Sequence, residues 1–209
     1  MDQTAAPPAE IAGGSSMGAT IRPAFHHVTI KTSRLGEMVE WYRNVVGAEV
    51  NFQDANNAWM TNDEANHRVA FLSVPGLKDD PDKTTHNGMH HSAFEYATFD
   101  DLMSSYERMR DIGITPAFCL DHGLTMSLYY RDPEGNFVEL QSDNFGDWKQ
   151  SNEFMRNSPD FASNPIGTFF DPEKVCEAHR AGASFAELQP AIRGGKFTPA
   201  EIPPMGLPV

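Results

Sequence analysis

An internal duplication constrains the fold of this 209-residue chain more than any other feature. A His-His pair that ends at His27 opens a segment of alternating apolar and polar residues, and a second pair that ends at His91 does the same. His27 precedes Gly47 by 20 residues, and His91 precedes Gly113 by 22. Between each pair and its glycine, a strand pattern gives way to helical spacing. A repeat of about 64 residues indicates two copies of one structural unit rather than two unrelated α/β stretches.

The first copy has the pattern of one strand, one helix and three strands. Residues 25–31 are predicted to form a strand, because β-branched residues alternate with polar ones. Ser33 can cap the helix that follows, and Gly47 suits the position just beyond its end. The three strands predicted next span residues 49–53, 58–61 and 68–74.

The second copy repeats this order after a polar linker at residues 76–88. A strand is predicted at residues 89–96, Thr98 or Asp100 can cap the next helix, and Gly113 ends it. The last three predicted strands span residues 115–120, 125–130 and 136–141.

The predicted fold class is α+β, with two tandem βαβββ modules that form a curled mixed sheet around a cleft. The modules occupy about residues 24–76 and 88–143 of a domain at residues 23–145. Residues 1–22, rich in Ala, Pro, Gly and Ser, are expected to be a flexible tail. Residues 146–209 are expected to be a C-terminal helical arm that packs on the core or reaches a neighbouring subunit.

Helix signals in the arm are local. A helix is predicted at residues 171–181, where an Asp-Pro pair supplies the cap and the first position and Gly182 supplies the stop. Ser184 and Glu187 can form the capping box of a further short turn. From Pro190 onward, proline and glycine residues are expected to interrupt regular structure.

Charge and composition exclude several classes of partner. Hydrophobic residues make up 40% of the chain and charged residues 22%, which is typical of a globular protein. The net charge of -13 argues against nucleic acid or an anionic membrane surface as the main partner, because both need a basic footprint. We expect no secretory signal and no membrane helix, because the N-terminus and the apolar runs lack the required patterns. Cys119 and Cys176 form no CxxC pair, so we expect inert thiols in a reducing cytoplasm.

One carboxylate of the second copy calls for a positive partner. Glu139 lies in an otherwise apolar predicted strand, where a carboxylate is costly unless a cation or metal ion meets it. A buried arginine could be that cation, but the nearby Arg131 falls in a predicted turn. Strand alternation places His27, His91 and Glu139 on the faces turned away from the helices. If the two copies curl together, these three residues converge in one metal cleft.

Two neutral imidazoles and one carboxylate leave three positions of an octahedron open, as in the facial triad of non-heme Fe(II) oxygenases. In the first copy, the residue that aligns with Glu139 is Ala70, which cannot bind a metal ion. The alignment therefore disfavours a four-ligand site with one carboxylate from each copy.

The motifs FHHVTI, HHSAFEY and DHGLTMSLYYRDPEGNFVEL resemble the vicinal oxygen chelate superfamily and, within it, the one-domain type I extradiol ring-cleaving dioxygenases. The resemblance covers about 120 residues, roughly 25–143. It implies that His27, His91 and Glu139 bind Fe(II), with Mn(II) as an alternative metal. The chain departs from the two-domain relatives in its single pair of modules and in a shorter loop between His122 and Tyr129.

The resemblance also implies three catalytic residues. His122 matches a family histidine beside the metal, Tyr129 matches the active-site tyrosine, and His67 looks like the acid–base histidine. A histidine suits the removal of a catechol proton near neutral pH, and a tyrosine can orient the bound hydroxyl by a hydrogen bond. Phe118 and Phe137 are expected among the walls of the cleft.

Several of these residues have a structural alternative. His122 lies in an Asp-His-Gly sequence that forms turns in its own right. Tyr130 competes with Tyr129, and alternation sends only one of them to the cleft. By the same alternation, His26 and His90 are expected to point away from their neighbours and to be structural.

The function predicted from the sequence is Fe(II)-dependent extradiol cleavage of a catechol-type aromatic diol by O2, adjacent to its hydroxyls. One alternative is a metal-dependent lyase or isomerase of the glyoxalase type, which would use a second carboxylate where Ala70 stands. The other is a metal-free small-molecule-binding protein on the same fold, in which the triad would be broken. The arm and the habit of the superfamily suggest a homo-oligomer.

Overall fold

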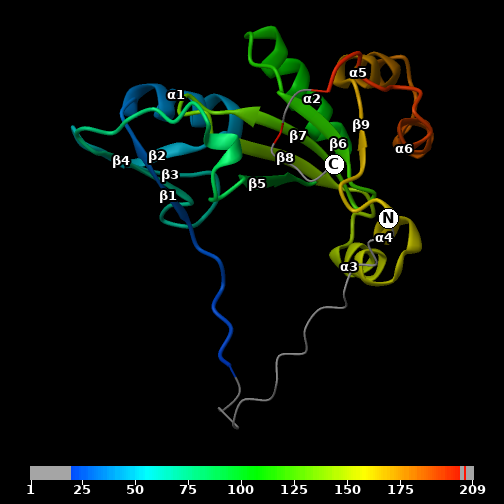
Figure 1. Ribbon diagram of the computed structural model, residues 1–209, viewed down its shortest axis with the longest axis horizontal. Helices are drawn as coiled ribbons and strands as arrows, with labels where there is room; N and C mark the ends of the chain where they lie inside the picture. The colour runs from blue at the N-terminus through cyan, green and yellow to red at the C-terminus, as the bar shows by residue number, and fades with distance from the viewer. Residues whose placement is uncertain (1–19, 203–204, 206–209) are drawn as a thin grey trace, which may run out of the picture.

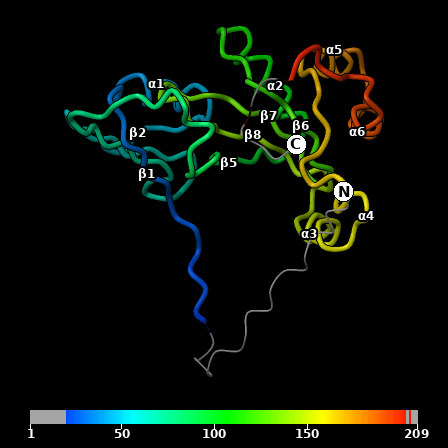
Figure 2. The backbone as a smooth tube through the Cα atoms, viewed as in Figure 1, coloured from blue at the N-terminus to red at the C-terminus, as the bar shows by residue number. Residues whose placement is uncertain are grey.

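The computed structural model describes residues 20–202 and 205, and its ribbon is shown in Figure 1. Most of the predicted tail at residues 1–22 lies outside the described residues. The α+β class is confirmed, in the form of two open mixed sheets, one for each module. Figure 1 shows α1 and α2 on the same side of these sheets, and the smooth trace in Figure 2 shows the arm beyond the second sheet.

The first module has the predicted order of elements and forms a four-stranded sheet with strand order β1-β4-β3-β2. β1 runs parallel to β4, and the other neighbours are antiparallel. Its elements are β1 (Val28–Thr32), α1 (Leu35–Val46), β2 (Glu49–Gln53), β3 (Asn57–Thr61) and β4 (Val69–Ser73).

The second module follows a linker that contains one 3-10 turn, Lys83–Thr85, and forms a sheet with strand order β5-β8-β7-β6-β9. β5 runs parallel to β8, as β1 does to β4. Its elements are β5 (His91–Tyr96), α2 (Phe99–Asp111), β6 (Phe118–Asp121), β7 (Thr125–Arg131) and β8 (Phe137–Asp143).

The register of the two parallel pairs confirms the alignment of the copies. Thr29, two residues after His27, pairs with Ala70, and Ala93, two residues after His91, pairs with Glu139. Ala70 is therefore the structural equivalent of Glu139.

Local signals account for both module helices. Each buries one apolar face, and the largest fully buried side chains include Tyr42 of α1 and Met109 of α2. Thr98 is the N-cap of α2, as predicted, and accepts a hydrogen bond from the Asp101 amide. The prediction that Ser33 caps α1 is wrong, because the N-cap position is Arg34 and its side chain makes no capping bond.

The amide of Ser33 instead joins the two modules. It donates to Oε1 of Glu134 at 2.8 Å, and the hydroxyl of Thr32 donates to the same oxygen at 2.6 Å. Nη1 of Arg34 donates to the other carboxylate oxygen at 2.7 Å. Glu134 belongs to the turn between β7 and β8, so this turn holds the second module against the start of α1.

The arm packs against the second sheet. Its strand β9 (Thr168–Phe169) pairs antiparallel with β6 and extends the sheet by one strand. Two helices were not predicted from their polar sequences: α3 (Trp148–Asn157) and α4 (Pro159–Ser163). Within the described residues, we find no helix with the length and apolar character needed to cross a membrane.

The other two arm helices follow the sequence signals. α5 (Pro172–Arg180) has the predicted Asp171 cap, and α6 (Phe185–Arg193) has the predicted capping box. Pro190 does not end α6, contrary to expectation. The amide that proline lacks would have bonded to the first turn of this short helix, so the loss is one hydrogen bond near its beginning.

Candidate active site

Glu139 is the centre of a hydrogen-bonded group on the second sheet. Its carboxylate is almost fully buried, with Oε2 at 3.0 Å from Nε2 of His91. The hydroxyl of Tyr129 donates to Oε1 at 2.9 Å and lies 2.9 Å from Nε2 of His122. The structure thus brings together four of the six predicted site residues.

Strand pairing explains this assembly. Tyr129 on β7 lies directly opposite Glu139 on β8, so both side chains leave the same face of the sheet. Tyr130 points the other way into the core, where it is fully buried. Tyr129, and not Tyr130, therefore shares the face of Glu139, as strand alternation predicted. Arg131 belongs to β7 rather than a turn, and its guanidinium lies over the Phe137 ring at 4.2 Å from the centroid, so it does not neutralise Glu139.

Burial and the hydrogen bonds within this group shift the pKa values of Glu139, Tyr129 and His122. Burial alone would raise the pKa of Glu139, but hydrogen bonds from His91, Ser127 and Tyr129 and the charge of His91 lower it overall. Burial and the Glu139 carboxylate raise the pKa of Tyr129, so its hydroxyl keeps its proton. Burial lowers the pKa of His122, and this outweighs the opposing effects of Glu139, the Ile166 carbonyl and Asp121. At neutral pH the site therefore holds a carboxylate, a phenol and a neutral imidazole.

The turn that carries His122 is built by its neighbours. The buried carboxylate of Asp121 accepts hydrogen bonds from the amide of Gly123 at 2.7 Å and from the side chain of Asn144 at 3.1 Å. Gly123 has a φ of 85°, which suits glycine. The turn expected from the Asp-His-Gly sequence therefore forms, and it positions the His122 ring beside the Tyr129 hydroxyl.

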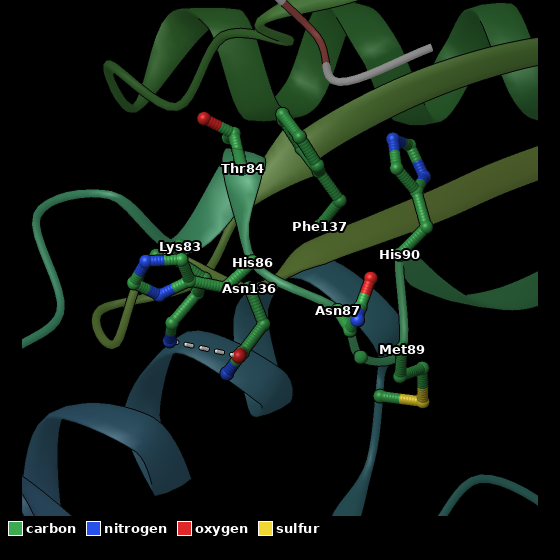
Figure 3. Close-up of a pocket in the computed structure, with 10 residues that line it drawn as sticks. Lys83, Thr84, His86, Asn87, Met89, His90, Asn136 and Phe137 are labelled. Carbon is green, nitrogen blue, oxygen red and sulfur yellow. Dashed lines mark hydrogen bonds between the residues drawn. The ribbon is translucent and has the colours of Figure 1, made fainter. Parts of the chain in front are cut away.

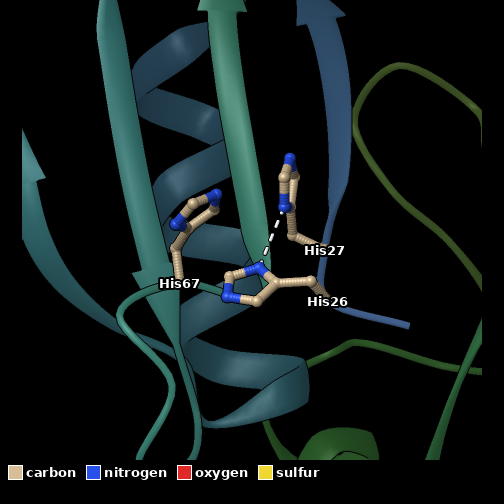
Figure 4. A group of neighbouring side chains, drawn as sticks. All are labelled: His26, His27 and His67. Atoms are coloured by element: carbon tan, nitrogen blue, oxygen red, sulfur yellow. Dashed lines mark hydrogen bonds between the residues drawn. The ribbon is translucent and has the colours of Figure 1, made fainter. Parts of the chain in front are cut away.

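His27 and His67 lie in the first module, at a distance from this group. Figure 4 shows them with His26, and one ligand atom from each of the three rings lies within 4.8 Å of the others. Among the described residues, His27, His91 and Glu139 do not form a group of that tightness. His27 and His91 do line one cavity of about 530 Å³, and Glu139 adjoins it through its contact with His91.

The expectation that His26 points away from His27 is wrong. The Nδ1 atoms of the two rings lie 3.0 Å apart. Strand alternation does not govern them, because β1 begins only at Val28. The same expectation is wrong for His90, whose Nδ1 lies 2.8 Å from that of His91, although His90 also stacks on Phe137 and contacts the Met205 carbonyl at 2.8 Å.

His90 also lines a separate polar cavity of about 220 Å³, shown in Figure 3. There Nζ of Lys83 donates to the Glu134 carbonyl at 2.7 Å and to the Asn136 side chain at 3.1 Å. This cavity lies beside the turn that joins the modules. Phe137, expected as a wall of the cleft, lines it, but none of the predicted metal-binding or catalytic residues does.

Two contributors were not predicted from the sequence. Ser127, two residues before Tyr129 on β7, faces the Glu139 carboxylate. Met205 of the arm is buried against an aromatic cluster that includes Phe118, Tyr129 and Phe137. Alternation along β7 could have identified Ser127, whereas no local pattern places Met205 beside a strand so distant in sequence.

One pair of donor atoms, from His91 and Glu139, fits a metal ion in type and spacing. Imidazole and carboxylate are ligands that divalent iron and manganese accept. Two donors at right angles about an ion, with bonds of roughly 2.1 Å, lie about 3.0 Å apart, and Nε2 of His91 and Oε2 of Glu139 lie 3.0 Å apart. The imidazole of His27 borders the same cavity as His91.

Residues 24–140 match the family model of the Glyoxalase/Bleomycin resistance protein/Dioxygenase superfamily. The chain belongs to this superfamily.

Two curated relatives come from Rhodococcus globerulus. Biphenyl-2,3-diol 1,2-dioxygenase 2 is 42% identical over 163 residues, which are 78% of this chain and 85% of that protein. Biphenyl-2,3-diol 1,2-dioxygenase 3 is 39% identical over 170 residues, which are 81% and 88% of the two chains. A solved glyoxylase/bleomycin resistance protein/dioxygenase domain from Frankia sp. EAN1pec is 18% identical, with a TM-score of 0.48 over 59% of this chain and 93% of that chain.

Proposed function

We propose that this protein is an extradiol dioxygenase that cleaves a catechol-type aromatic diol with O2, adjacent to its hydroxyls. The observation that carries the proposal is the buried Glu139 carboxylate, met by His91 and Tyr129 on the face of a superfamily domain. The names of the two relatives support it, since a 1,2-dioxygenase of a 2,3-diol acts on the ring bond beside the hydroxylated carbons. Biphenyl-2,3-diol is accordingly the first substrate to test.

In this proposal His27, His91 and Glu139 hold Fe(II), with Mn(II) as the alternative. When bound, the metal supplies electrons for O2 and open positions for the two oxygens of the diol. Tyr129 keeps its hydroxyl proton and holds the Glu139 carboxylate in one orientation through its 2.9 Å hydrogen bond. The neutral Nε2 of His122, next to that hydroxyl, is placed to accept or donate a proton at the substrate.

His67 is the proposed base for the diol. Burial and the neighbouring His27 and His26 lower its pKa, so the ring is neutral at neutral pH and able to accept a proton. Phe118, Phe137 and the ring of Tyr129 provide an apolar wall for an aromatic substrate, because they pack together on the same face of the second sheet.

The glyoxalase-type lyase is the weaker candidate. It would need a carboxylate in the first module, and the strand register places Ala70 at that position. A cytoplasmic location and a homo-oligomer are also part of our proposal, the second to be checked by light scattering of the full chain.

Anaerobic purification, iron quantification and a scan of catechols test the function. We expect iron-loaded protein to consume O2 with biphenyl-2,3-diol and to form a yellow ring-fission product. A Glu139→Gln variant should lose iron and activity together. Iron-loaded protein that consumes no O2 with any catechol would overturn the proposal, and full metal retention by Glu139→Gln would overturn the ligand assignment.

A further inference from the structure

Three imidazoles meet at one edge of the first sheet, as Figure 4 shows. β1 and β4 are parallel, and Val28 lies opposite Val69. The residues just before the two strands therefore lie at the same end of the sheet, which places His26 and His27 beside His67. The ring centroids of His27 and His67 lie 4.3 Å apart, and those of His26 and His67 lie 5.2 Å apart.

Neighbouring groups hold two of these histidines in place. Nδ1 of His67 lies 2.7 Å from the side-chain oxygen of Asn66, which fixes the ring and leaves Nε2 free to bind a ligand. Nη1 of Arg68 donates to the carbonyl of His26 at 2.9 Å. Nε of Arg68 donates to the nearby carboxylate of Asp63 at 2.8 Å, so this carboxylate is already paired. The possible metal ligands in the cluster are therefore the three imidazoles alone.

We propose that His26, His27 and His67 form a second, inhibitory site for a divalent cation that prefers imidazole ligands, such as Zn²⁺. Three imidazoles whose donor atoms lie within 4.8 Å of one another suit such an ion, and both His26 and His27 are exposed to solvent. The inhibition rests on the proposed function, because a Zn²⁺ ion held here takes His27 from the iron site and blocks His67.

The second module provides an internal comparison. His90 and His91 also stand side by side, with Nδ1 atoms 2.8 Å apart. The residue before β8 that matches His67 is Asn136, so this edge offers two imidazoles rather than three. Because only the first module has a third histidine, we place the Zn²⁺ site in the first module alone.

Equilibrium dialysis with Zn²⁺ tests binding independently of activity. The full chain carries Glu139→Gln, which removes one ligand of the proposed iron site. In that background, His26→Gln should weaken Zn²⁺ binding roughly tenfold or more. The matched variant His90→Gln, at the equivalent place in the other module, should leave the affinity unchanged. Circular dichroism checks that both variants fold, and His67→Gln provides a second test of the same site.

Inhibition is measured in the iron-loaded chain, as the activity with Zn²⁺ divided by the activity of the same variant without it. We expect His26→Gln to resist Zn²⁺ and His90→Gln to remain sensitive. Equal Zn²⁺ affinity in the two dialysis variants would overturn the site. Zn²⁺ binding that depends on His26, in a protein with no dioxygenase activity, would keep the site and reject the proposed function.

Discussion

Tyr129 has one hydroxyl hydrogen and two polar neighbours at 2.9 Å, Oε1 of Glu139 and Nε2 of a neutral His122. The hydroxyl donates to the carboxylate. In the His122 tautomer that carries its hydrogen on Nε2, the tyrosine oxygen accepts from that nitrogen. The hydroxyl thus links the residue proposed to hold the metal to the residue proposed to act on the substrate.

Tyr129→Phe removes that link without changing the shape of the side chain. We expect kcat/KM for the diol to fall roughly tenfold to hundredfold, because Glu139 and His122 lose their shared partner. Buried Glu139 also loses a donor, at a cost of about 1–3 kcal/mol in the free energy of unfolding. Oxygen uptake and chemical unfolding measure the two effects. Tyr96→Phe, which loses a hydrogen bond to Ser105 outside the site, is the control; equal activity loss in both variants would contradict the prediction.

The pKa of Asp63 can be used to test the structure of the loop that leads to His67. The hydrogen bond from Arg68, followed by that from the Ala65 amide, lowers its pKa from 3.8 to about 2. The pair contributes to stability above pH 3.8 and loses that contribution as the pH falls through the folded-state value. We expect a carboxyl titration by NMR to find this low pKa, and Arg68→Gln to move it upward. An ordinary value in the unmodified protein would show that the ion pair does not form in solution.

At the scale of elements, the sequence predicts the modules better than the arm. Strand alternation and glycine stops are local, so each strand of the two modules lies within a few residues of its predicted position. β9 has only two residues and exists because β6 offers a free edge, which no local pattern reveals. For the same reason the sequence places Tyr129 and Glu139 in one predicted site but does not reveal the neighbouring Met205.

Gly167, just before β9, is a position where only glycine fits. Its φ is 97°, and a Cβ there would overlap the carbonyl of Asp121, which begins the His122 turn. We expect Gly167→Ala to lower the free energy of unfolding by roughly 2 kcal/mol or more and to reduce activity by displacing that turn. Gly182→Ala is the matched control, because its φ is 98° but no atom lies within 4 Å of the added Cβ. Equal destabilisation of both variants would show that backbone strain alone, and not the overlap, sets the cost.

At the scale of the whole molecule, the relation between the modules is the part that sequence could not supply. Alternation correctly assigns His91 and Glu139 to one face, because they lie on neighbouring strands of one sheet. It cannot place His27 relative to them, because that depends on how two separate sheets meet. The contacts that decide this include Glu134 with Thr32 and Arg34, two polar pairs about 100 residues apart in sequence.

Glu134 therefore tests the junction between the modules. Burial alone would raise the pKa of Glu134, but hydrogen bonds donated by Thr32, Ser33 and Arg34 lower it overall. The ionised carboxylate therefore stabilises the fold at pH values above 4.5, the ordinary pKa of a glutamate. This stabilisation is lost as the pH falls through the lower pKa of the folded state. We expect Glu134→Gln to cost about 1–3 kcal/mol at pH 7 and less at pH 3.5, measured by denaturant unfolding. Glu40→Gln, which removes an exposed pair with Arg43, is the control and should change little at either pH. If Glu134→Gln is as stable as the unmodified chain at pH 7, the junction does not depend on this carboxylate, and the two modules are held together by their shared apolar core alone.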